Sequence, residues 1–413
     1  MKRIVQTLAI GTTCLLMLSS SAFAAYTENS KSAHTYTEGN MEIPEEMLLQ
    51  EDALNAYNTL YSTFEIDENY NYVLPDDYAG EYINDDYKLV IQLTTDDYSY
   101  YETILSDYDC VEFRTVEYSY NQLYKLADET RSTVLEDMSE TVYVSSKVNV
   151  KDNIAKVEIG VPSSTKRNAK LSVSVNNDLP LDIEYVTVDP NKSDATLLSN
   201  YNNNSTLASQ VNNLIGGDLI ESYLVSASLG ICGTHNGKNA VLTAGHAFDV
   251  NTKIMHDSNY FGLVSYKRFE NNQYGDFGII DLYDYSSCTP TNKVNYKTNT
   301  VNITSTVYSV PVGTTCNKYG QKSKYATILT TGTENITYTL DDDSKTQITI
   351  KGLVCADLKS GTSQKGDSGG PIYISQNGKW TFCGVHSGAD TSASSVYFTP
   401  YLHIYGVFTA KTS

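Results

Sequence analysis

The sequence is short of basic residues. Its 413 residues include 29 Lys+Arg against 49 Asp+Glu, which gives a net charge of −20. A protein that binds the nucleic-acid backbone needs a basic surface, so this composition disfavours a nucleic-acid partner. Beyond the N-terminus there is also no apolar run long enough to cross a bilayer. We therefore expect no nucleic-acid partner and no membrane partner.

The N-terminus has the pattern of a secretory signal peptide. In "MKRIVQTLAIGTTCLLMLSSSAFAAYT" two cations precede an apolar run of about 15 residues, which ends in the small residues "AFA". We place the signal peptide at residues 1–25 and expect a secreted, extracellular protein.

Cysteine is sparse, and no two of the seven cysteines form a CxxC motif of the kind that binds zinc. We therefore expect no metal and no cofactor. Export permits disulfide bonds, so we expect some. The back half has five cysteines, an odd number, so at least one of them is free or pairs with a cysteine elsewhere. The cysteines are Cys14, Cys110, Cys232, Cys288, Cys316, Cys355 and Cys383.

The acidic charge is confined to the front half of the chain. Residues 26–213 carry 34 Asp+Glu against 12 Lys+Arg, whereas residues 214–413 carry 15 of each. Such a split indicates two units with different roles, although solubility alone also explains much of the acid. Residues 190–213 are rich in Asn and Ser, a linker composition. We therefore divide the mature chain into a unit at 26–213, with its linker at 190–213, and a unit at 214–413.

The two units differ in secondary-structure pattern. In the front unit, apolar residues recur at helical spacing over 45–64, a second helix is expected over 120–138, and strands over 87–94, 153–161, 170–177 and 182–189. This pattern predicts an α+β unit. After residue 214, short runs of Val, Ile, Thr, Tyr and Phe alternate with Gly, Asn, Asp and Ser turns, which predicts an all-β barrel or sandwich.

Ser368 lies in the glycine-rich stretch "KGDSGGPIY". Serine beside glycine is common in loops, so the motif alone does not make a nucleophile. A nucleophilic serine needs a base, a group that orients the base, and an oxyanion hole. A tight turn here can aim the amides of Gly366 and Ser368 at one point, which is the geometry of an oxyanion hole.

A candidate base and its orienting carboxylate lie upstream. His246 ends the apolar run "NAVLTAGH", where a strand end would expose it, and histidine exchanges protons near neutral pH. Asp276 lies between Gly275 and an apolar stretch, so it can be buried beside the imidazole. Asp281 is the second choice, and Asp284 lies in a more polar run. The order His246, Asp276, Ser368 is the one found in chymotrypsin-type proteases.

These motifs resemble the chymotrypsin-fold serine endopeptidases, in particular the bacterial secreted streptogrisins and α-lytic protease. The resemblance rests on "LIGGDLI", "VLTAGHA", "GDFGII", "KGDSGGPIY", "CGVHSG" and "VYFTPYLHIYGVF", and it covers about 200 residues. It implies a chymotrypsin-like double β-barrel with a closing C-terminal helix. It also implies that residues 26–213 are a pro-region that assists folding and inhibits until removed. We expect a monomeric zymogen that acts on protein or peptide substrates.

The sequence departs from this family at two places. The family's disulfide across the histidine loop is missing, because Ala227 and Ala247 stand at its positions. An arginine that usually follows a later cysteine is also missing, since "CNKYG" has Asn317 there. We expect Lys318, the next residue, to supply the counter-charge of Asp367 instead.

The resemblance places the specificity pocket at Thr362, Lys365, His386, Ser387 and Gly388. Thr362 stands where an aspartate would select Lys or Arg, so a trypsin-like preference is not expected. His386 and Lys365 would together favour an acidic residue before the scissile bond. The alternative is that both are ordinary structural residues. The expected maturation site, "ASQVNNLIGG", contains no acidic residue, which argues against self-cleavage with that preference.

Two other functions compete with a protease. A non-catalytic binding or adhesion protein on the same fold would normally lack a triad residue, and none is missing here. An esterase of the α/β-hydrolase type would follow the order Ser, Asp, His on a strand–helix turn, which this chain does not have.

Overall fold

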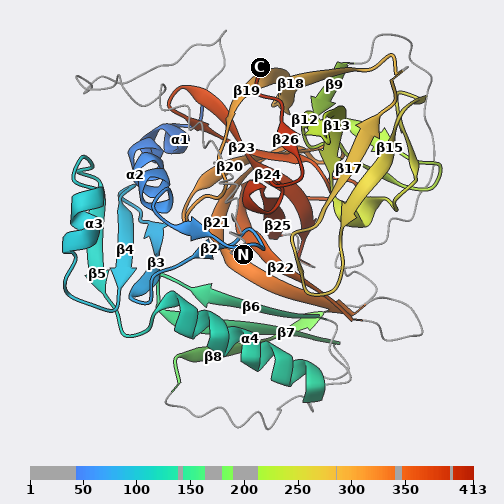
Figure 1. The fold of residues 1–413 in the computed structure, drawn as a ribbon. Coiled ribbons are helices and arrows are strands. Elements are labelled where there is room, and N and C mark those ends of the chain that lie inside the picture. Colours follow the sequence, from blue (N-terminus) through green and yellow to red (C-terminus); the bar gives the residue numbers. More distant parts are fainter. Residues whose placement is uncertain are drawn as a thin grey trace, which may run out of the picture. The chain divides into compact units, whose positions relative to one another are not determined.

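The computed structural model describes residues 43–137, 143–162, 179–188, 213–284, 286–339, 347–390 and 394–413 (Figure 1). The expected signal peptide, the expected strand over 170–177 and all but the last residue of the expected linker lie outside them. Residues Ile43–Ser413 pack as one unit. No helix of this described part is long and apolar enough to cross a membrane.

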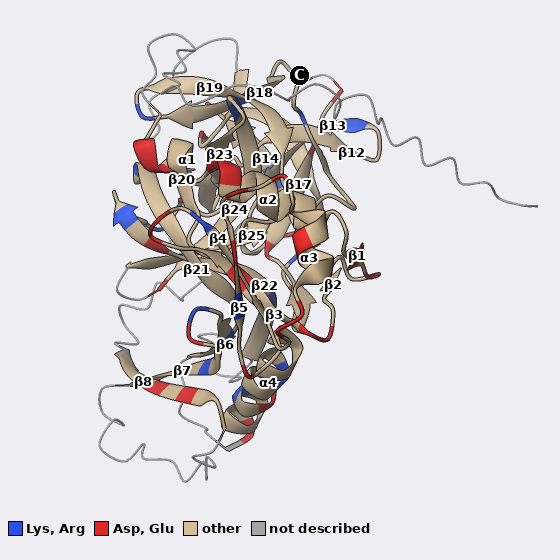
Figure 2. Ribbon diagram, turned by 90° about the vertical axis from the view of Figure 1, so that its left-hand side faces the viewer, with Lys and Arg blue, Asp and Glu red and all other residues tan. Residues whose placement is uncertain are grey.

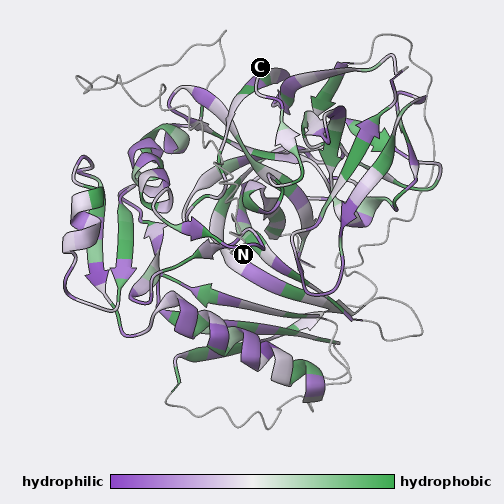
Figure 3. Cartoon of the chain, in the orientation of Figure 1, coloured by the Kyte–Doolittle hydropathy of each residue, from purple (hydrophilic) through white to green (hydrophobic). Residues whose placement is uncertain are grey.

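The first part of the front half packs helices on a small sheet. The expected helix over 45–64 is interrupted at Gln50, whose side chain bonds both backbone groups of Thr315 at 2.8–2.9 Å. Strand order is β3-β4-β5, and Figure 3 shows β4 as hydrophobic along most of its length. The elements are α1 (Glu45–Leu49), α2 (Glu51–Tyr61), β1 (Glu65–Ile66), β2 (Tyr72–Val73), β3 (Tyr78–Ile83), β4 (Leu89–Leu93), α3 (Ser99–Ile104) and β5 (Val111–Thr115).

The second part joins the back half through a shared sheet. Helix α4 (Tyr120–Asp137) packs on strands β6 (Tyr143–Asn149) and β7 (Ile154–Pro162), and β8 (Leu181–Val188) pairs with β7. Strand β6 pairs antiparallel with β21 (Lys324–Thr339) of the back half. Figure 2 shows acidic residues on α3, on α4 and in nearby loops of this front half. The α+β prediction is confirmed for the described residues.

The back half is built of two sheets, as the all-β prediction requires. The first has the strand order β11-β10-β14-β15-β17-β13-β12-β26 around an apolar core. Its strands are β10 (Leu219–Glu221), β11 (Ser226–Ser228), β12 (Cys232–His235), β13 (Lys238–Thr243), β14 (Lys253–His256), β15 (Asn259–Arg268), β17 (Phe277–Leu282) and β26 (Thr409–Ala410).

The second sheet runs β16-β22-β25-β24-β23-β20-β21 and continues into the front half through β6. Three further strands, β9, β18 and β19, attach to it at β24. The strands are β9 (Asn213–Gly216), β16 (Gln273–Tyr274), β18 (Thr289–Tyr296), β19 (Asn299–Thr306), β20 (Thr315–Gly320), β22 (Gln347–Ser360), β23 (Pro371–Gln376), β24 (Lys379–Ala389) and β25 (Ser395–Pro400).

The expectation of a C-terminal helix is wrong. The chain forms only a 3-10 turn at Tyr401–His403 and then the short strand β26. The Tyr401 hydroxyl donates to the Phe408 carbonyl and accepts from the Ala410 amide, and β26 pairs with β12. These bonds hold the end of the chain extended rather than helical.

The expected disulfide bonds are also not found. Each of the six described cysteines is a free thiol. The Sγ atoms of Cys232 and Cys383 donate to the carbonyls of Leu214 and Thr381, at 3.4 and 3.7 Å. Burial raises the pKa of Cys232 to about 12, which disfavours the thiolate that disulfide exchange requires.

A buried carboxyl lies in the front half beneath α2. Glu81, on β3, is 7% exposed and accepts hydrogen bonds from the hydroxyls of Tyr61, at 3.0 Å, and Tyr78. Burial raises its pKa to about 7, and the two tyrosine donors only partly oppose this.

We predict that Glu81→Gln removes a pH-dependent loss of stability. The pKa of Glu81 is about 7 in the folded protein and 4.5 ordinarily. Between pH 4.5 and 7, Glu81 is therefore protonated in the folded protein and ionised in the unfolded chain. Unfolding free energy should therefore fall by about 3 kcal/mol as pH rises through this window. Denaturant unfolding of a Ser368→Ala background, with and without Glu81→Gln, measures it. The control Glu68→Gln, at an exposed glutamate, should show the same decrease in unfolding free energy with pH as the parent protein. A Glu81→Gln protein that also keeps this decrease contradicts the prediction.

Candidate active site

The structure brings His246, Asp276 and Ser368 together from three separate elements. His246 lies in a 3-10 turn, Gly245–Ala247, that follows β13 directly. Asp276 immediately precedes β17, and Ser368 lies in the turn between β22 and β23. His246 and Asp276 therefore stand beside strand ends and Ser368 in a turn between two strands, where each side chain can turn toward the other two.

The three side chains form a continuous hydrogen-bonded line. His246 Nδ1 lies 2.6 Å from Asp276 Oδ2, and His246 Nε2 lies 3.0 Å from Ser368 Oγ. The His246 backbone amide also donates to Asp276 Oδ1, at 2.9 Å. With Nδ1–H directed at the carboxylate, Nε2 is left to accept a proton from the serine hydroxyl.

Asp276 is fully buried, and two further residues bond its carboxylate and its backbone. Ser387 Oγ donates to Oδ2, and Thr399 bonds both backbone groups of Asp276 at 2.8–2.9 Å. Burial alone would raise the pKa of Asp276. The charge of His246 and the hydrogen bonds from His246 and Ser387 outweigh it, so the pKa lies below the ordinary value. The carboxylate is ionised and can stabilise an imidazolium.

The two other candidate carboxylates lie away from His246. Asp281 Oδ1 lies 2.9 Å from Nδ1 of a different histidine, His235. Asp284 is exposed. Of the three aspartates weighed from the sequence, the structure brings Asp276 to the imidazole.

The turn around Ser368 requires glycine. Gly366 has φ +99°, and a Cβ there would lie 2.7 Å from Gln321 Nε2. Gly369 has φ +88°, and a Cβ there would lie 2.2 Å from Thr243 Oγ1. Ser228 fixes the turn from β11, since its Oγ donates to the Gly366 carbonyl and its amide to the Ser368 carbonyl, each at 2.8 Å.

The same turn buries an ion pair. Lys318 Nζ lies 2.9 Å from Asp367 Oδ2, and both side chains are fully buried. Asp367 also accepts from the amides of Lys322, Ser323 and Gln364. Burial would raise the pKa of Asp367, but Lys318 and Ser323 lower it below the ordinary value. The assignment of Lys318 as the counter-charge is confirmed.

The predicted specificity residues lie around the nucleophile in two different settings. Thr362 and Lys365 are exposed on the loop before Ser368. On β24, His386 is buried and its Nε2 lies 3.0 Å from Ser363 Oγ. Burial, and then the charge of Lys318, lower the pKa of His386 well below its ordinary value, so this imidazole is neutral at neutral pH.

Ser387 and Gly388 follow His386 on β24. The Ser387 hydroxyl is bonded to Asp276, and its carbonyl accepts from Ser368 Oγ at 3.2 Å. A Cβ added at Gly388 would meet no atom within 4 Å, so the space above this glycine is open. Among the described residues, no group of three or more His, Cys, Asp or Glu is placed to hold a metal ion.

Sequence reasoning missed three residues that build the site: Ser228, Ser363 and Thr399. Their contacts with the nucleophile turn, His386 and Asp276 join strands far apart in the chain. Ser363 could have been noticed, since it stands five residues before Ser368 in the same loop. Ser228 and Thr399 carry no spacing signal, because their roles depend on how the two sheets meet.

Comparisons with known proteins agree with this architecture. Residues 220–409 match the family model described as Trypsin, and residues 44–117 match the one described as Pro-like N-terminal domain, together more than half of the chain. These matches confirm the resemblance to a chymotrypsin-fold protease that follows a pro-region. No curated protein matches the chain.

Several solved structures are similar to about half of the chain. Thermobifida fusca protease A and Cellulomonas bogoriensis chymotrypsin are each 22% identical, with a TM-score of 0.39, covering 49% of this chain and 100% of their own. A glutamic acid specific serine protease, described as using a novel histidine triad in substrate binding, is 25% identical with a TM-score of 0.38. It covers 47% of this chain and 99% of its own.

We predict that Lys318→Met lowers the free energy of unfolding by about 3–5 kcal/mol, because it leaves the Asp367 carboxylate buried without its counter-charge. The loss should shrink at low pH, where the unpaired Asp367, its pKa now raised, takes up a proton on folding. Denaturant unfolding as a function of pH measures both effects. Lys322→Met, at an exposed neighbouring lysine, should change little. Equal stability of the two variants would refute the role given to the pair.

Proposed function

Since the chain belongs to the trypsin family of serine proteases over residues 220–409, behind a Pro-like N-terminal domain, we propose that it is a secreted serine endopeptidase made as a zymogen. The observation that carries this proposal is the hydrogen-bonded line from Asp276 through His246 to Ser368. A serine with only a structural role in a loop does not require an imidazole 3.0 Å away, nor a buried carboxylate that holds the other nitrogen of that imidazole.

In this mechanism Ser368 Oγ attacks the carbonyl carbon of the scissile bond while His246 Nε2 takes its proton. Asp276 holds the Nδ1–H tautomer and stabilises the imidazolium that forms. The amides of Gly366 and Ser368, which donate to no described residue, stabilise the developing oxyanion. His246 then gives the proton to the leaving amine. In the second half of the reaction His246 takes a proton from water, whose oxygen attacks the acyl carbon, and returns that proton to Ser368 Oγ as the bond between Ser368 and the acyl group breaks.

The pro-region is proposed to act as an intramolecular chaperone and inhibitor. Strand β6 covers the edge of β21, and the Lys147–Glu334 ion pair crosses this junction with Glu334 3% exposed. Non-local strand pairing is slow because the chain must close a loop before it gains contacts. A preformed partner strand would lower that cost for the long β21–β22 hairpin.

We also propose where the enzyme acts and on what. The N-terminal pattern of residues 1–25 supports secretion, and the acidic composition gives no basic surface for nucleic acid. We propose a monomer that acts outside the cell on protein or peptide substrates.

We propose further that the enzyme prefers substrates with an acidic residue before the scissile bond. His386 and Ser363 offer neutral hydrogen-bonding groups behind the nucleophile, and Lys365 offers an exposed cation on the same loop. A carboxylate side chain that enters beside Gly388 would accept from the neutral groups and be attracted by Lys365. Because His386 is neutral, the charge selection depends on Lys365.

We predict that the secreted wild-type protein loses its residues up to about 213, as expected for self-cleavage by a pocket that prefers acidic residues without requiring them, whereas Ser368→Ala stays full length. Intact mass and N-terminal sequencing of both proteins measure this. A labelled fluorophosphonate should mark wild type and fail on Ser368→Ala. Absence of labelling in matured wild type would favour a non-catalytic binding protein. Processing of both proteins alike would show cleavage by another protease, and labelling would then decide whether Ser368 is active.

We predict that wild type cleaves peptides with Glu before the scissile bond faster than the matched Gln peptides, and that Lys365→Gln lowers this ratio roughly two- to fivefold. Loss of an exposed cation removes attraction for the charged side chain only. The measurement is kcat/KM on peptide pairs that differ only at this position. Lys359→Gln, an exposed lysine outside the site, serves as the control. Equal rates on Glu and Gln peptides in wild type would rule out the acidic preference.

A further inference from the structure

The buried carboxyl of Glu81 lies where the front half meets the back half. Its strand β3 binds the back half directly, because the amide of Ile83, two residues further on, donates to the Val312 carbonyl at 2.7 Å. Gly313 allows this approach, since a Cβ there would lie 2.3 Å from the Ile83 carbonyl oxygen. The apolar core that contains Ile83 also contains residues of the second sheet. The two halves therefore share one core at this junction.

Helix α2 covers Glu81 and also docks on the back half. Its Tyr61 donates to the Glu81 carboxyl, and the helix contacts both β4 and β23, the strand that follows the nucleophile turn. Asn55 on α2 holds the docked position, because its side-chain oxygen accepts from the side chains of Gln376 and Asn377 at 2.8–2.9 Å. A helix α2 that leaves β23 therefore takes a hydrogen-bond donor of Glu81 with it.

Two backbone amides report whether the halves are joined. Gln50 is fully buried between α1 and α2, and its Oε1 accepts from the amide of Thr315 on β20. The Thr315 amide thus has its acceptor in the front half. In the opposite direction, the Ile83 amide has its acceptor in the back half. Each of these two junction amides loses its acceptor when the halves separate.

The site around Glu81 is lined by uncharged groups. The titratable side chains that face it are all tyrosines: Tyr57 and Tyr61 from α2, Tyr72 from β2, Tyr78 from β3 and Tyr120 from α4. The pKa of each tyrosine is raised, so all five are neutral at neutral pH. Among the described residues, no lysine, arginine or histidine contributes to the pKa of Glu81. An ionised Glu81 would therefore lack a counter-charge, which destabilises the contacts that keep it buried.

We propose that Glu81 is a pH-sensitive switch of the zymogen. Protonated Glu81 keeps α2 docked on the back half, and ionised Glu81 lets α2 leave, so the pro-region is released more readily at neutral than at acidic pH. The proposal rests on the proposed zymogen function and adds a regulation to it. An acidic medium prolongs the inhibited state, and neutralisation favours activation without any change in the triad.

The direction of the effect depends on which state holds the proton. The pKa of Glu81 is about 7 while α2 is docked, and 4.5 once the side chain reaches water. Below pH 4.5 both states are protonated, and docking is most stable. Docking weakens as pH rises from 4.5 to 7, because only the released state ionises there, and it levels off above 7. Between pH 5 and pH 8 the docking equilibrium should change by about 70-fold.

Hydrogen–deuterium exchange on the full-length Ser368→Ala protein tests this without self-cleavage. We expect the protection factors of the Ile83 and Thr315 amides, corrected for the intrinsic effect of pH on exchange, to fall by about 70-fold from pH 5 to pH 8. Adding Glu81→Gln should keep both protection factors nearly constant, because the amide side chain does not ionise. Adding Glu68→Gln, at an exposed glutamate, should leave the fall unchanged.

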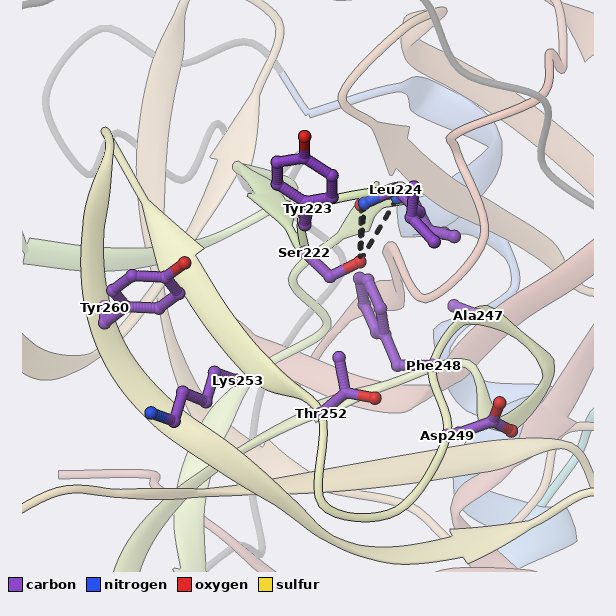
Figure 4. Close-up of a pocket in the computed structure, with 10 residues that line it drawn as sticks. Ser222, Tyr223, Leu224, Ala247, Phe248, Asp249, Thr252, Lys253 and Tyr260 are labelled. Carbon is purple, nitrogen blue, oxygen red and sulfur yellow. Dashed lines mark hydrogen bonds between the residues drawn. The ribbon is translucent and has the colours of Figure 1, made fainter.

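The first sheet supplies an internal control. Thr252 stands at the wall of a pocket of about 330 Å³ in this sheet (Figure 4). Its carbonyl accepts from the amide of the buried Val264, at 3.0 Å. The protection of Val264 should be the same with and without Glu81→Gln at every pH, because this bond does not cross the junction between the halves.

Tyr61→Phe provides a second variant, which deletes one donor to the carboxylate and keeps the ring. The pKa of Glu81 should rise further, because the hydrogen bond from Tyr61 lowers it. The fall in protection of the two junction amides should then extend to higher pH than in the parent protein.

Three results would overturn the switch. The first is a fall at Ile83 and Thr315 that Glu81→Gln does not remove, or no fall at all. The second is an equal fall at Val264, which would show that pH acts on the whole fold rather than on docking. The third is an unshifted profile in Tyr61→Phe. Each of these leaves the protease function standing, because fluorophosphonate labelling of Ser368 in wild type tests that function separately.

Discussion

The buried carboxylate of Asp276 is the interaction on which the arrangement of the site depends. Asp276 lies at the start of a strand of the first sheet, yet Ser387, which donates to its carboxylate, and Thr399, which bonds its backbone, belong to the second sheet. A carboxylate without solvent must have its lone pairs satisfied, so the two sheets have to meet in one relative position to supply the donors. The same oxygen atoms hold both the ring and the backbone of His246. The bonds that satisfy this charge therefore also place the imidazole in front of Ser368.

A second buried charge places the nucleophile. Asp367 is held by Lys318 from β20 and by amides of the following turn, so the loop before Ser368 is tied to a strand on its far side. Ser228 of the first sheet ties the same loop from the opposite direction. Neither tie touches the reacting atoms. Both restrict the backbone at Gly366 and Ser368, the two residues whose amides are the proposed oxyanion donors, and preorganised donors lower a reaction barrier because they need no reorganisation.

Much of this could be predicted from the sequence, and the failures have physical causes. Short motifs predicted His246, Asp276 and Ser368, because strand ends and glycine turns are local features. The alternating pattern predicted the β structure of the back half for the same reason. The expected helix at the C-terminus failed because Tyr401 and the pairing of β26 with β12 hold that segment extended. Ser228 and Thr399 could not be predicted, since their partners lie 138 and 123 residues away.

The candidate site is divided between the two sheets. Strand ends of the first sheet carry His246 and Asp276, and the turn before β23 of the second sheet carries Ser368. Neither sheet holds all three residues, so the hydrogen-bonded line exists only where the sheets meet, at the junction that Asp276 stabilises. Thr362 and Lys365 lie on an exposed loop, so they can change without disturbing the buried charges that keep the sheets together.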